Sequence, residues 1–194
     1  MMKFSSRVLL LVLTMAGSGC VHQAQAIVVS PALVAPMTRT GTGQRVSVVV
    51  LDERAQPSLG ARGFQNIGAD LTLAGDIASI VSNSIVDGMK AQNFAATADS
   101  ADVGRTLRVE IRAIEYDLRQ GMWSGSLRVS TSFKGYCIRD AARPYEHVYN
   151  GEHLESGLQI IPSSSENNVF VSDSVSKAVN ALVADAAMMA CLAL

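Results

Sequence analysis

An unbroken alternation of apolar and polar residues over positions 123–134 constrains the fold of this chain more than any other feature. Successive side chains of a β-strand point to opposite faces of a sheet. The alternation therefore predicts a long strand with one face in the core and the other in water. The residues that we expect on the core face are Trp123, Gly125, Leu127, Val129, Thr131 and Phe133.

Two further runs extend this strand into an antiparallel meander. Over residues 106–118 apolar and polar residues alternate again, and a change of phase before Ile114 predicts a β-bulge. The turn at 119–121 joins the two runs, and residues 145–155 predict a third strand.

The remaining elements are strands and helices on either side of the meander. Residues 46–51 are β-branched and predict a buried strand, residues 94–98 predict a short one, and apolar residues at helical spacing predict a helix over about 73–92. A capping box at 163–166 begins a C-terminal helix. The apolar stripe of that helix consists of Val175, Val179, Leu182, Ala186 and Met189.

The predicted order is β-α-(β)-β-β-β-α. A 194-residue chain with 48% hydrophobic residues has enough apolar material for a core. We expect an α+β domain at 46–194, in which two amphipathic helices pack on one face of a mainly antiparallel sheet of about four strands.

The N-terminus has the features of an export signal with two alternative cleavage sites. Lys3 and Arg7 precede an apolar run at 8–16, which is too short to span the roughly 30 Å of a bilayer. The sequence Gly17-Ser18-Gly19-Cys20 resembles a bacterial lipobox, although Gly17 stands where leucine is usual. Ala24-Gln25-Ala26 instead fits the ordinary signal peptidase.

We expect cleavage before Cys20, because the lipobox follows the apolar run directly. Residues 1–19 are then a lipoprotein signal peptide, and Cys20 carries a diacylglycerol and a further acyl chain such as palmitate, which together anchor stably. Val21, in place of Asp, lacks an inner-membrane retention signal. This indicates the periplasmic face of the outer membrane of a Gram-negative bacterium. Residues 20–45 predict a flexible tether, in which 27–29 form a possible edge strand.

The charge of the mature chain argues against nucleic acid as a partner. Removal of 1–19 leaves 14 basic and 17 acidic residues, a formal charge of −3. No later apolar run reaches the roughly 20 residues of a transmembrane helix, so we expect membrane attachment through the N-terminal lipid alone.

Two cysteines remain once Cys20 is lipidated. In an oxidising periplasm an even pair, Cys137 and Cys191, favours a disulfide that fastens the last helix to the sheet. Against it, Cys191 lies two residues from Met189, about 200° around a helix and off the apolar stripe. Both alternatives stay open.

Residues with catalytic or metal-binding chemistry are sparse. His147 and His153 are six residues apart on one strand, roughly 20 Å, too far to share an ion, and His22 belongs to the tether. The glycines and serine at 121–125 do not have the spacing of the nucleophile elbow of a serine hydrolase. The glycines at 41–43 precede a strand and lack the third glycine of a dinucleotide-binding loop. We expect no catalytic residue, no metal and no cofactor.

The loop after the first strand has two interpretations. Asp52, Arg54 and Arg62 bind an anionic or sugar ligand through bidentate contacts, or they pin the loop as a structural ion pair. The polar face of the sheet also has two interpretations: it docks an envelope protein or an acidic glycan, or it is an ordinary solvated face. The apolar C-terminal segment 186–194 is either part of the core or a docking helix for another subunit. The basic residues of the sheet face are Arg108, Arg112, Arg128 and Lys134.

Several of these segments resemble the YajG family of bacterial lipoproteins. The resemblance rests on Ile27-Val28-Val29-Ser30-Pro31, on Asp52-Glu53-Arg54 directly after the strand at 46–51, and on Gly60-Ala61-Arg62-Gly63. The later elements agree in order as far as the C-terminus. The resemblance implies a lipoprotein of the Gram-negative envelope without an established biochemical activity.

We expect an outer-membrane-anchored periplasmic lipoprotein that binds or scaffolds another envelope component and is not an enzyme. The alternative is an envelope hydrolase acting near peptidoglycan. In that case the fold would bring Asp52 beside Glu110 or His147 in a cleft.

Overall fold

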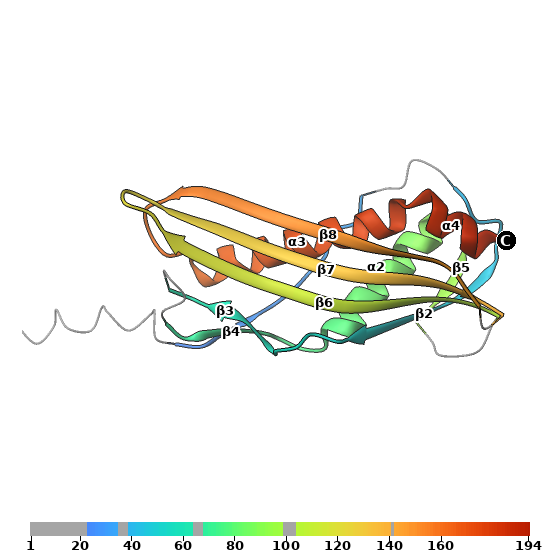
Figure 1. The fold of residues 1–194 in the computed structure, drawn as a ribbon, viewed down its shortest axis with the longest axis horizontal. Coiled ribbons are helices and arrows are strands. Elements are labelled where there is room, and N and C mark those ends of the chain that lie inside the picture. Colours follow the sequence, from blue (N-terminus) through green and yellow to red (C-terminus); the bar gives the residue numbers. More distant parts are fainter. Residues whose placement is uncertain (1–22, 35–38, 64–67, 99–103, 141) are drawn as a thin grey trace, which may run out of the picture.

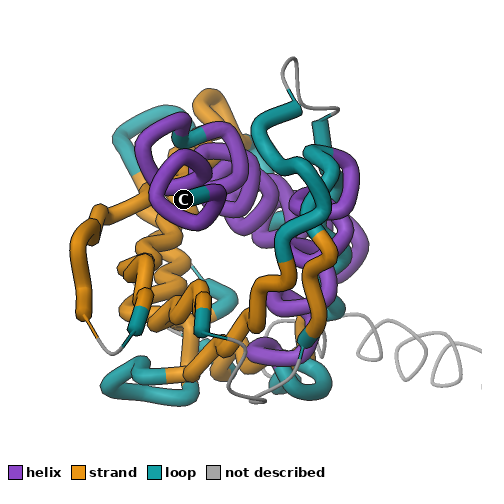
Figure 2. The backbone as a smooth tube through the Cα atoms, turned by 90° about the vertical axis from the view of Figure 1, so that its right-hand side faces the viewer, coloured by secondary structure: helices purple, strands orange, loops and turns teal. Residues whose placement is uncertain are grey.

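The computed structural model describes residues 23–34, 39–63, 68–98, 104–140 and 142–194, so the predicted signal peptide and Cys20 lie outside the described residues. In this part of the chain, three helices lie against one side of the strands (Figure 1, Figure 2). The helices are α2 (Ile77–Ala91), α3 (Ser164–Ala184) and α4 (Ala186–Ala193). The strands are β1 (Gln25–Ile27), β2 (Arg45–Asp52), β3 (Ser58–Ala61), β4 (Asp70–Leu73), β5 (Ala95–Thr97), β6 (Arg105–Gln120), β7 (Gly125–Arg139) and β8 (Ala142–Leu158).

The predicted meander is confirmed as the long part of a five-stranded sheet with the order β5-β2-β6-β7-β8. Strands β6, β7 and β8 are antiparallel to their neighbours. Because successive side chains of a strand point to opposite faces, every second side chain of these strands faces the helices. The predicted bulge is also confirmed, because the pairing of β6 with β7 shifts register between Ile111 and Ala113. Trp123 is an exception to the predicted core row, since β7 begins at Gly125 and Trp123 lies exposed in the preceding turn.

The expected fold class, a mainly antiparallel sheet of about four strands with two helices, is wrong. The described residues form eight strands in two mixed sheets. Strands β5 and β6 run parallel to β2, because α2 carries the chain back across the sheet before it enters them. A second sheet has the order β1-β4-β3, and its strands of three or four residues are too short to show an alternating pattern.

Part of the predicted tether, 20–45, is ordered within the domain. Strand β1 pairs in parallel with β4 at the edge of the small sheet, and the residues after it run along α3. Ile27 and Val29 are buried in the main core. The domain as described therefore includes β1 and does not begin at position 46.

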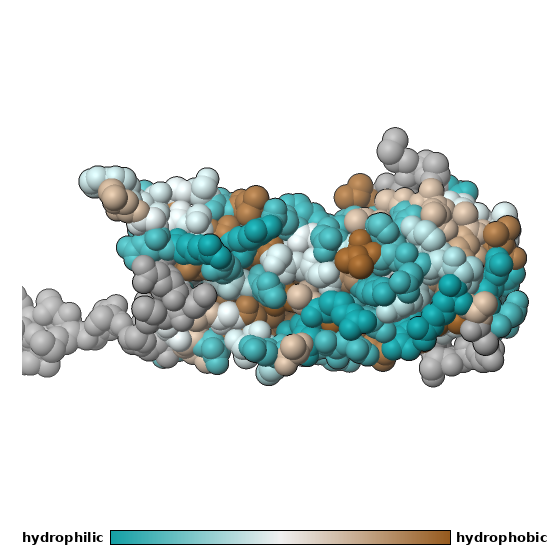
Figure 3. Space-filling view, viewed as in Figure 1, coloured by the Kyte–Doolittle hydropathy of each residue, from teal (hydrophilic) through white to brown (hydrophobic). Residues whose placement is uncertain are grey.

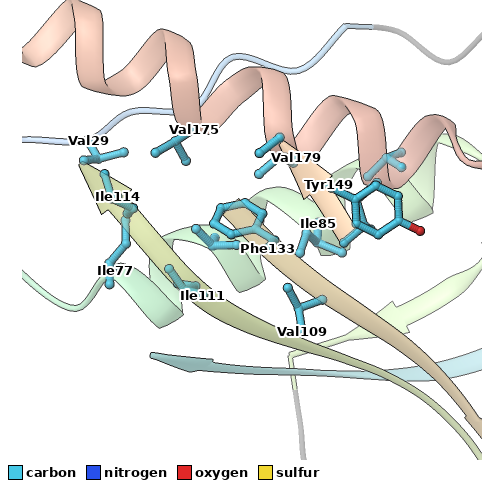
Figure 4. Close-up of a cluster of buried hydrophobic side chains, with 14 of the residues drawn as sticks. Val29, Ile77, Ile85, Val109, Ile111, Ile114, Phe133, Tyr149, Val175 and Val179 are labelled. Carbon is cyan, nitrogen blue, oxygen red and sulfur yellow. The ribbon is translucent and has the colours of Figure 1, made fainter. Parts of the chain in front are cut away.

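The core lies between the five-stranded sheet and the helices (Figure 4). Phe133 of β7 is fully buried at its centre, with Ile85 of α2 on one side and Val175 and Val179 of α3 on the other. Helix α3 lies very close to β8, because a Cβ on Gly151 would overlap the carbonyl oxygen of Ser174. Glycine is therefore required at this contact.

The predicted C-terminal helix is two helices that meet at a 51° bend. Asp185 ends α3 and caps α4, so Ala186 is exposed and does not continue the apolar stripe. The bend turns Cys191 towards β7, where it forms a disulfide with Cys137 across a Cα separation of 6.4 Å. On one straight helix Cys191 would lie off the apolar stripe and away from β7, so the bend is what allows this bridge.

No single helix in the described residues is long and apolar enough to cross a membrane. The bent pair α3 and α4 reaches that length and composition only when its two members are taken together.

The capping box at the start of α3 is confirmed. The backbone N–H of Ser163 donates to Glu166 at 2.7 Å, and Ser163 Oγ accepts from the backbone N–H of Glu166 at 3.3 Å. We expect Ser163→Ala to lower the free energy of unfolding by about 1 kcal/mol, measured by urea denaturation. Ser165→Ala, in the same exposed turn, should change it by less than about 0.5 kcal/mol. Equal losses in the two variants would contradict the capping role.

Candidate functional surfaces

The loop after β2 is held by a bidentate ion pair. Arg54 donates from Nε to Asp52 Oδ1 and from Nη2 to Asp52 Oδ2, each at 2.8 Å, and from Nη1 to the carbonyl oxygen of Pro57 at 3.4 Å. The hydrogen bond from Arg54 lowers the pKa of Asp52 below its ordinary value. Because the carboxylate occupies the fork of the guanidinium, the geometry is that of a loop-pinning pair.

Arg62 lies apart from this pair, just after β3. Its backbone N–H donates to the carbonyl oxygen of Ala69, and its charge acts on the hydroxyl of Tyr116. Burial raises the pKa of Tyr116, whereas Arg62 lowers it. The three residues Asp52, Arg54 and Arg62 therefore do not converge on one ligand position.

The role of Arg54 is testable through the pKa of its partner. In Arg54→Ala, the pKa of Asp52 should rise towards its ordinary value, as measured by NMR titration of the side-chain carboxyl. The pair stabilises the fold above the unfolded pKa of Asp52, and this stabilisation is lost as the pH falls through the lower folded pKa. Since Asp52 is partly exposed, we expect a stability loss below about 1 kcal/mol. An unchanged Asp52 pKa would contradict the pairing.

A buried carboxylate organises the outer face of the sheet. Glu110 of β6 accepts from Arg108 Nη2 at 2.9 Å, from Tyr136 Oη at 3.0 Å, and from Arg112. Glu53, after β2, lies 3.8 Å from both arginines. The cluster contains two arginines and two carboxylates, so its charges balance.

The remaining basic residues of this face are paired in the same way. Lys134 Nζ lies 3.0 Å from Glu146 Oε1, and Arg128 contacts Glu152. Figure 3 shows a largely hydrophilic face with separate apolar patches. Since each of the four predicted basic residues has a carboxylate partner, the face lacks the unbalanced positive charge that would attract acidic glycans.

The residues of the hydrolase alternative are not brought together. Asp52 pairs with the core residue Ile111 in the sheet register, so its side chain leaves the sheet on the opposite face from Glu110. His147 lies between Tyr145 and Tyr149 on β8, which is two strands away from β6 and Glu110 in the order of the sheet. In the described part of the chain, no group of three or more His, Cys, Asp or Glu residues is placed to hold a metal ion.

His153 makes a contact that sequence reasoning missed. Its Nδ1 lies 2.7 Å from Asp173 Oδ2 on α3, and its ring stacks on Phe170 at a centroid distance of 4.5 Å. Burial would raise the pKa of Asp173, but hydrogen bonds from Lys177 and His153 hold it below its ordinary value. His153 thus joins β8 to α3, and its contacts with Asp173 and Phe170 explain its position without a ligand.

An extended segment runs along α3 and forms a regular ladder with it. Every second backbone N–H of residues 28–34 donates to every fourth side chain of the helix, at 2.9 to 3.1 Å. Two residues of extended chain cover about 6.6 Å and four helical residues cover about 6.0 Å, so the two repeats match. The pairs are Val28 with Asn168, Ser30 with Ser172, Ala32 with Ser176 and Val34 with Asn180.

This ladder forms the floor of an open groove of about 700 Å³ between the segment and α3. Val28, Val34 and Val169 line it and are exposed, and its lining is mainly apolar. Its volume falls in the usual range for binding sites, roughly 300 to 1,000 Å³. The polar residues four apart on α3 were the sequence signal for this surface.

Comparison with known proteins gives a family and a fold. A family model described as uncharacterized lipoprotein matches residues 31–193. A crystal structure of a protein from Xanthomonas campestris aligns with a TM-score of 0.56 at 13% identity, over 83% of this chain and 91% of that one. A minor lipoprotein from Acinetobacter baumannii aligns with a TM-score of 0.45 at 4% identity, over 72% of this chain and 89% of that one. No curated protein matches the chain.

The Xanthomonas structure shares the fold, since its similarity extends over most of both chains. Neither the family description nor these two names refers to an enzyme activity.

Proposed function

Because the chain belongs to the family of uncharacterized lipoproteins whose model matches residues 31–193, we propose that Cys20 anchors it to the outer membrane of a Gram-negative bacterium. The domain then lies on the periplasmic side, where it binds or scaffolds another envelope component and performs no chemistry itself. The resemblance to the YajG family and the lipobox support the anchor, and Val21 supports the outer membrane.

One observation carries the choice of Cys20: the alternative cleavage site lies inside β1. Cleavage after Ala26 would remove Gln25, a buried residue whose side chain donates to the carbonyl oxygen of Ser164 at 2.9 Å and accepts from Asn167 at 3.0 Å. Asn167 is fully buried and also accepts from Tyr116. A buried polar group left unpaired costs about 1 to 3 kcal/mol. Cleavage before Cys20 keeps this network intact.

Metabolic labelling with an alkyne fatty acid tests the anchor. The wild type should be labelled and recovered in the outer-membrane fraction, whereas Cys20→Ala should be unlabelled and recovered in the periplasm. Equal labelling of the two proteins, or a mature N-terminus at Ile27, would refute lipidation.

The groove along α3 supports the binding role. It is open, and its exposed lining surface is mainly apolar although polar residues alternate with the valines along it. Alternate N–H groups of the neighbouring segment are already used by the helix. Its occupant is a row of apolar side chains from an extended segment of an envelope protein.

A photo-crosslinking amino acid at Val169 tests this role in intact envelopes. It should give an adduct of one discrete mass, and Ala32→Glu, which places a charge in the groove, should abolish it. The matched control position is Val148, exposed on the outer face of β8. Adducts that are the same at both positions, or that survive Ala32→Glu, would contradict the groove as the binding site.

A further inference from the structure

The distance between the proposed anchor and the folded domain is short. Four residues lie between Cys20 and Gln25, the first residue of β1, so five Cα–Cα steps join them. A fully extended chain covers at most about 3.6 Å per residue, so this span is at most about 18 Å. If the proposed lipid anchor at Cys20 is correct, the end of the domain that holds Gln25 lies at the membrane surface.

Three other segments lie at that end. Gln25 contacts Ser164 at the start of α3, which follows the loop after β8. The last residue of β8, Leu158, pairs with Gly125, the first residue of β7. The turn between β6 and β7 and the loop between β8 and α3 therefore lie at the same end of the molecule as β1 (Figure 1).

The two most exposed large apolar side chains in the described residues are at this end, whereas the next, Leu194 at 79%, is at the C-terminus. Met122 and Trp123 form the tip of the β6–β7 hairpin and are 88% and 87% exposed, and Ile160, in the loop after β8, is 75% exposed. The tip is a closed turn, because the backbone N–H of Gly121 donates to the carbonyl oxygen of Ser124 at 2.8 Å. The fold thus holds a tryptophan and a methionine in water, where they contribute nothing to the core.

Tryptophan has an amphipathic ring that favours the boundary between lipid headgroups and acyl chains. We propose that Met122 and Trp123, together with Ile160, insert into the surface of the bilayer that carries the lipid anchor. The anchor brings this end within reach, and the inserted side chains then fix the orientation of the domain, with the long axis of α3 leading away from the membrane. The groove along α3 extends away from the bilayer in this orientation.

Trp123 is the only tryptophan of the chain, so its fluorescence reports the tip directly. The lipidated full chain is reconstituted into phosphatidylcholine vesicles with or without brominated acyl chains. We expect strong quenching by the brominated lipid and a blue shift of the emission relative to soluble Cys20→Ala. The double variant Met122→Ser/Ile160→Ser should lose at least half of the quenching.

Val34→Ser is the matched control. The exposed fraction of Val34, 73%, is similar to that of Ile160. Val34 lies beside Asn180 near the other end of α3, however, so its replacement should leave the quenching unchanged. Flotation of the protein with vesicles without quenching would overturn this inference and leave the anchor standing. If the purified wild-type chain carries no lipid and is still quenched, insertion is supported and the anchor is refuted. Absence of both flotation and quenching would overturn both.

Discussion

Reduction of the disulfide between Cys137 and Cys191 should lower the free energy of unfolding by about 4 kcal/mol. The two cysteines are 54 residues apart, and a bridge over a loop of this length removes much of the conformational freedom of the unfolded chain. Cys137 is fully buried on β7, and the bridge fixes α4 to the sheet. Urea denaturation with and without reductant, at fixed pH, measures the difference.

The double variant Cys137→Ala/Cys191→Ala is the control. It should be destabilised by a similar amount and should not respond to reductant. Hydrogen exchange should increase first in α4, because the bridge is the covalent link that fastens this eight-residue helix to β7. A reductant effect of the same size in the double variant would show that the loss has another source.

The long strands were predictable because their signal is long and local. Alternation over 123–134 and 106–118 fixes the facing of many side chains, and a single change of phase locates the bulge at Ile111 and Ala113. The capping box was predictable for the same reason, since Ser163 and Glu166 contact each other within one turn.

The elements that sequence reasoning missed depend on partners that are distant in the chain. Residues 30–34 have no local pattern of a strand, and the whole segment 28–34 is ordered by side chains of α3 about 140 residues away. The short strands β3 and β4 exist because they pair with each other and, through β1, with the same helix. With four residues each, β3 and β4 are too short for a period of two to be recognised.

The candidate site residues follow the same division. The pair Asp52 and Arg54 is local and was identified from the sequence, whereas Arg108 and Arg112 appeared as free basic residues. Their partner Glu110 is buried by the register of neighbouring strands, and Tyr136 comes from the adjacent strand β7. A basic row in a sequence cannot be interpreted as a cationic surface until that register is known.

Asp185→Ala should lower the free energy of unfolding by about 3 kcal/mol. One carboxylate oxygen accepts from the backbone N–H groups of Ala187 and Met188 and so caps α4. The other accepts from the hydroxyls of Tyr149 at 2.6 Å and Tyr145 at 2.9 Å, which fastens the bend between the two helices to β8. The expected loss of about 3 kcal/mol combines the loss of the helix cap with the loss of the acceptor for the buried hydroxyl of Tyr149. Urea denaturation at neutral pH measures the change in the free energy of unfolding.

Asp185→Asn separates the charge from the shape of the side chain and gives the pH dependence. Partial burial would raise the pKa of Asp185, but the hydrogen bonds from Tyr149 and Met188 hold it below its ordinary value. A lowered folded pKa stabilises the fold above the unfolded pKa of about 4, and the contribution is lost as the pH falls through the folded pKa. The stability gap between wild type and Asp185→Asn, about 1 kcal/mol at neutral pH, should therefore shrink towards zero as the pH falls through the lowered folded pKa of Asp185. A gap that stays constant over this range would show that the carboxylate charge does not hold the bend, and that the cap geometry alone accounts for the loss in Asp185→Ala.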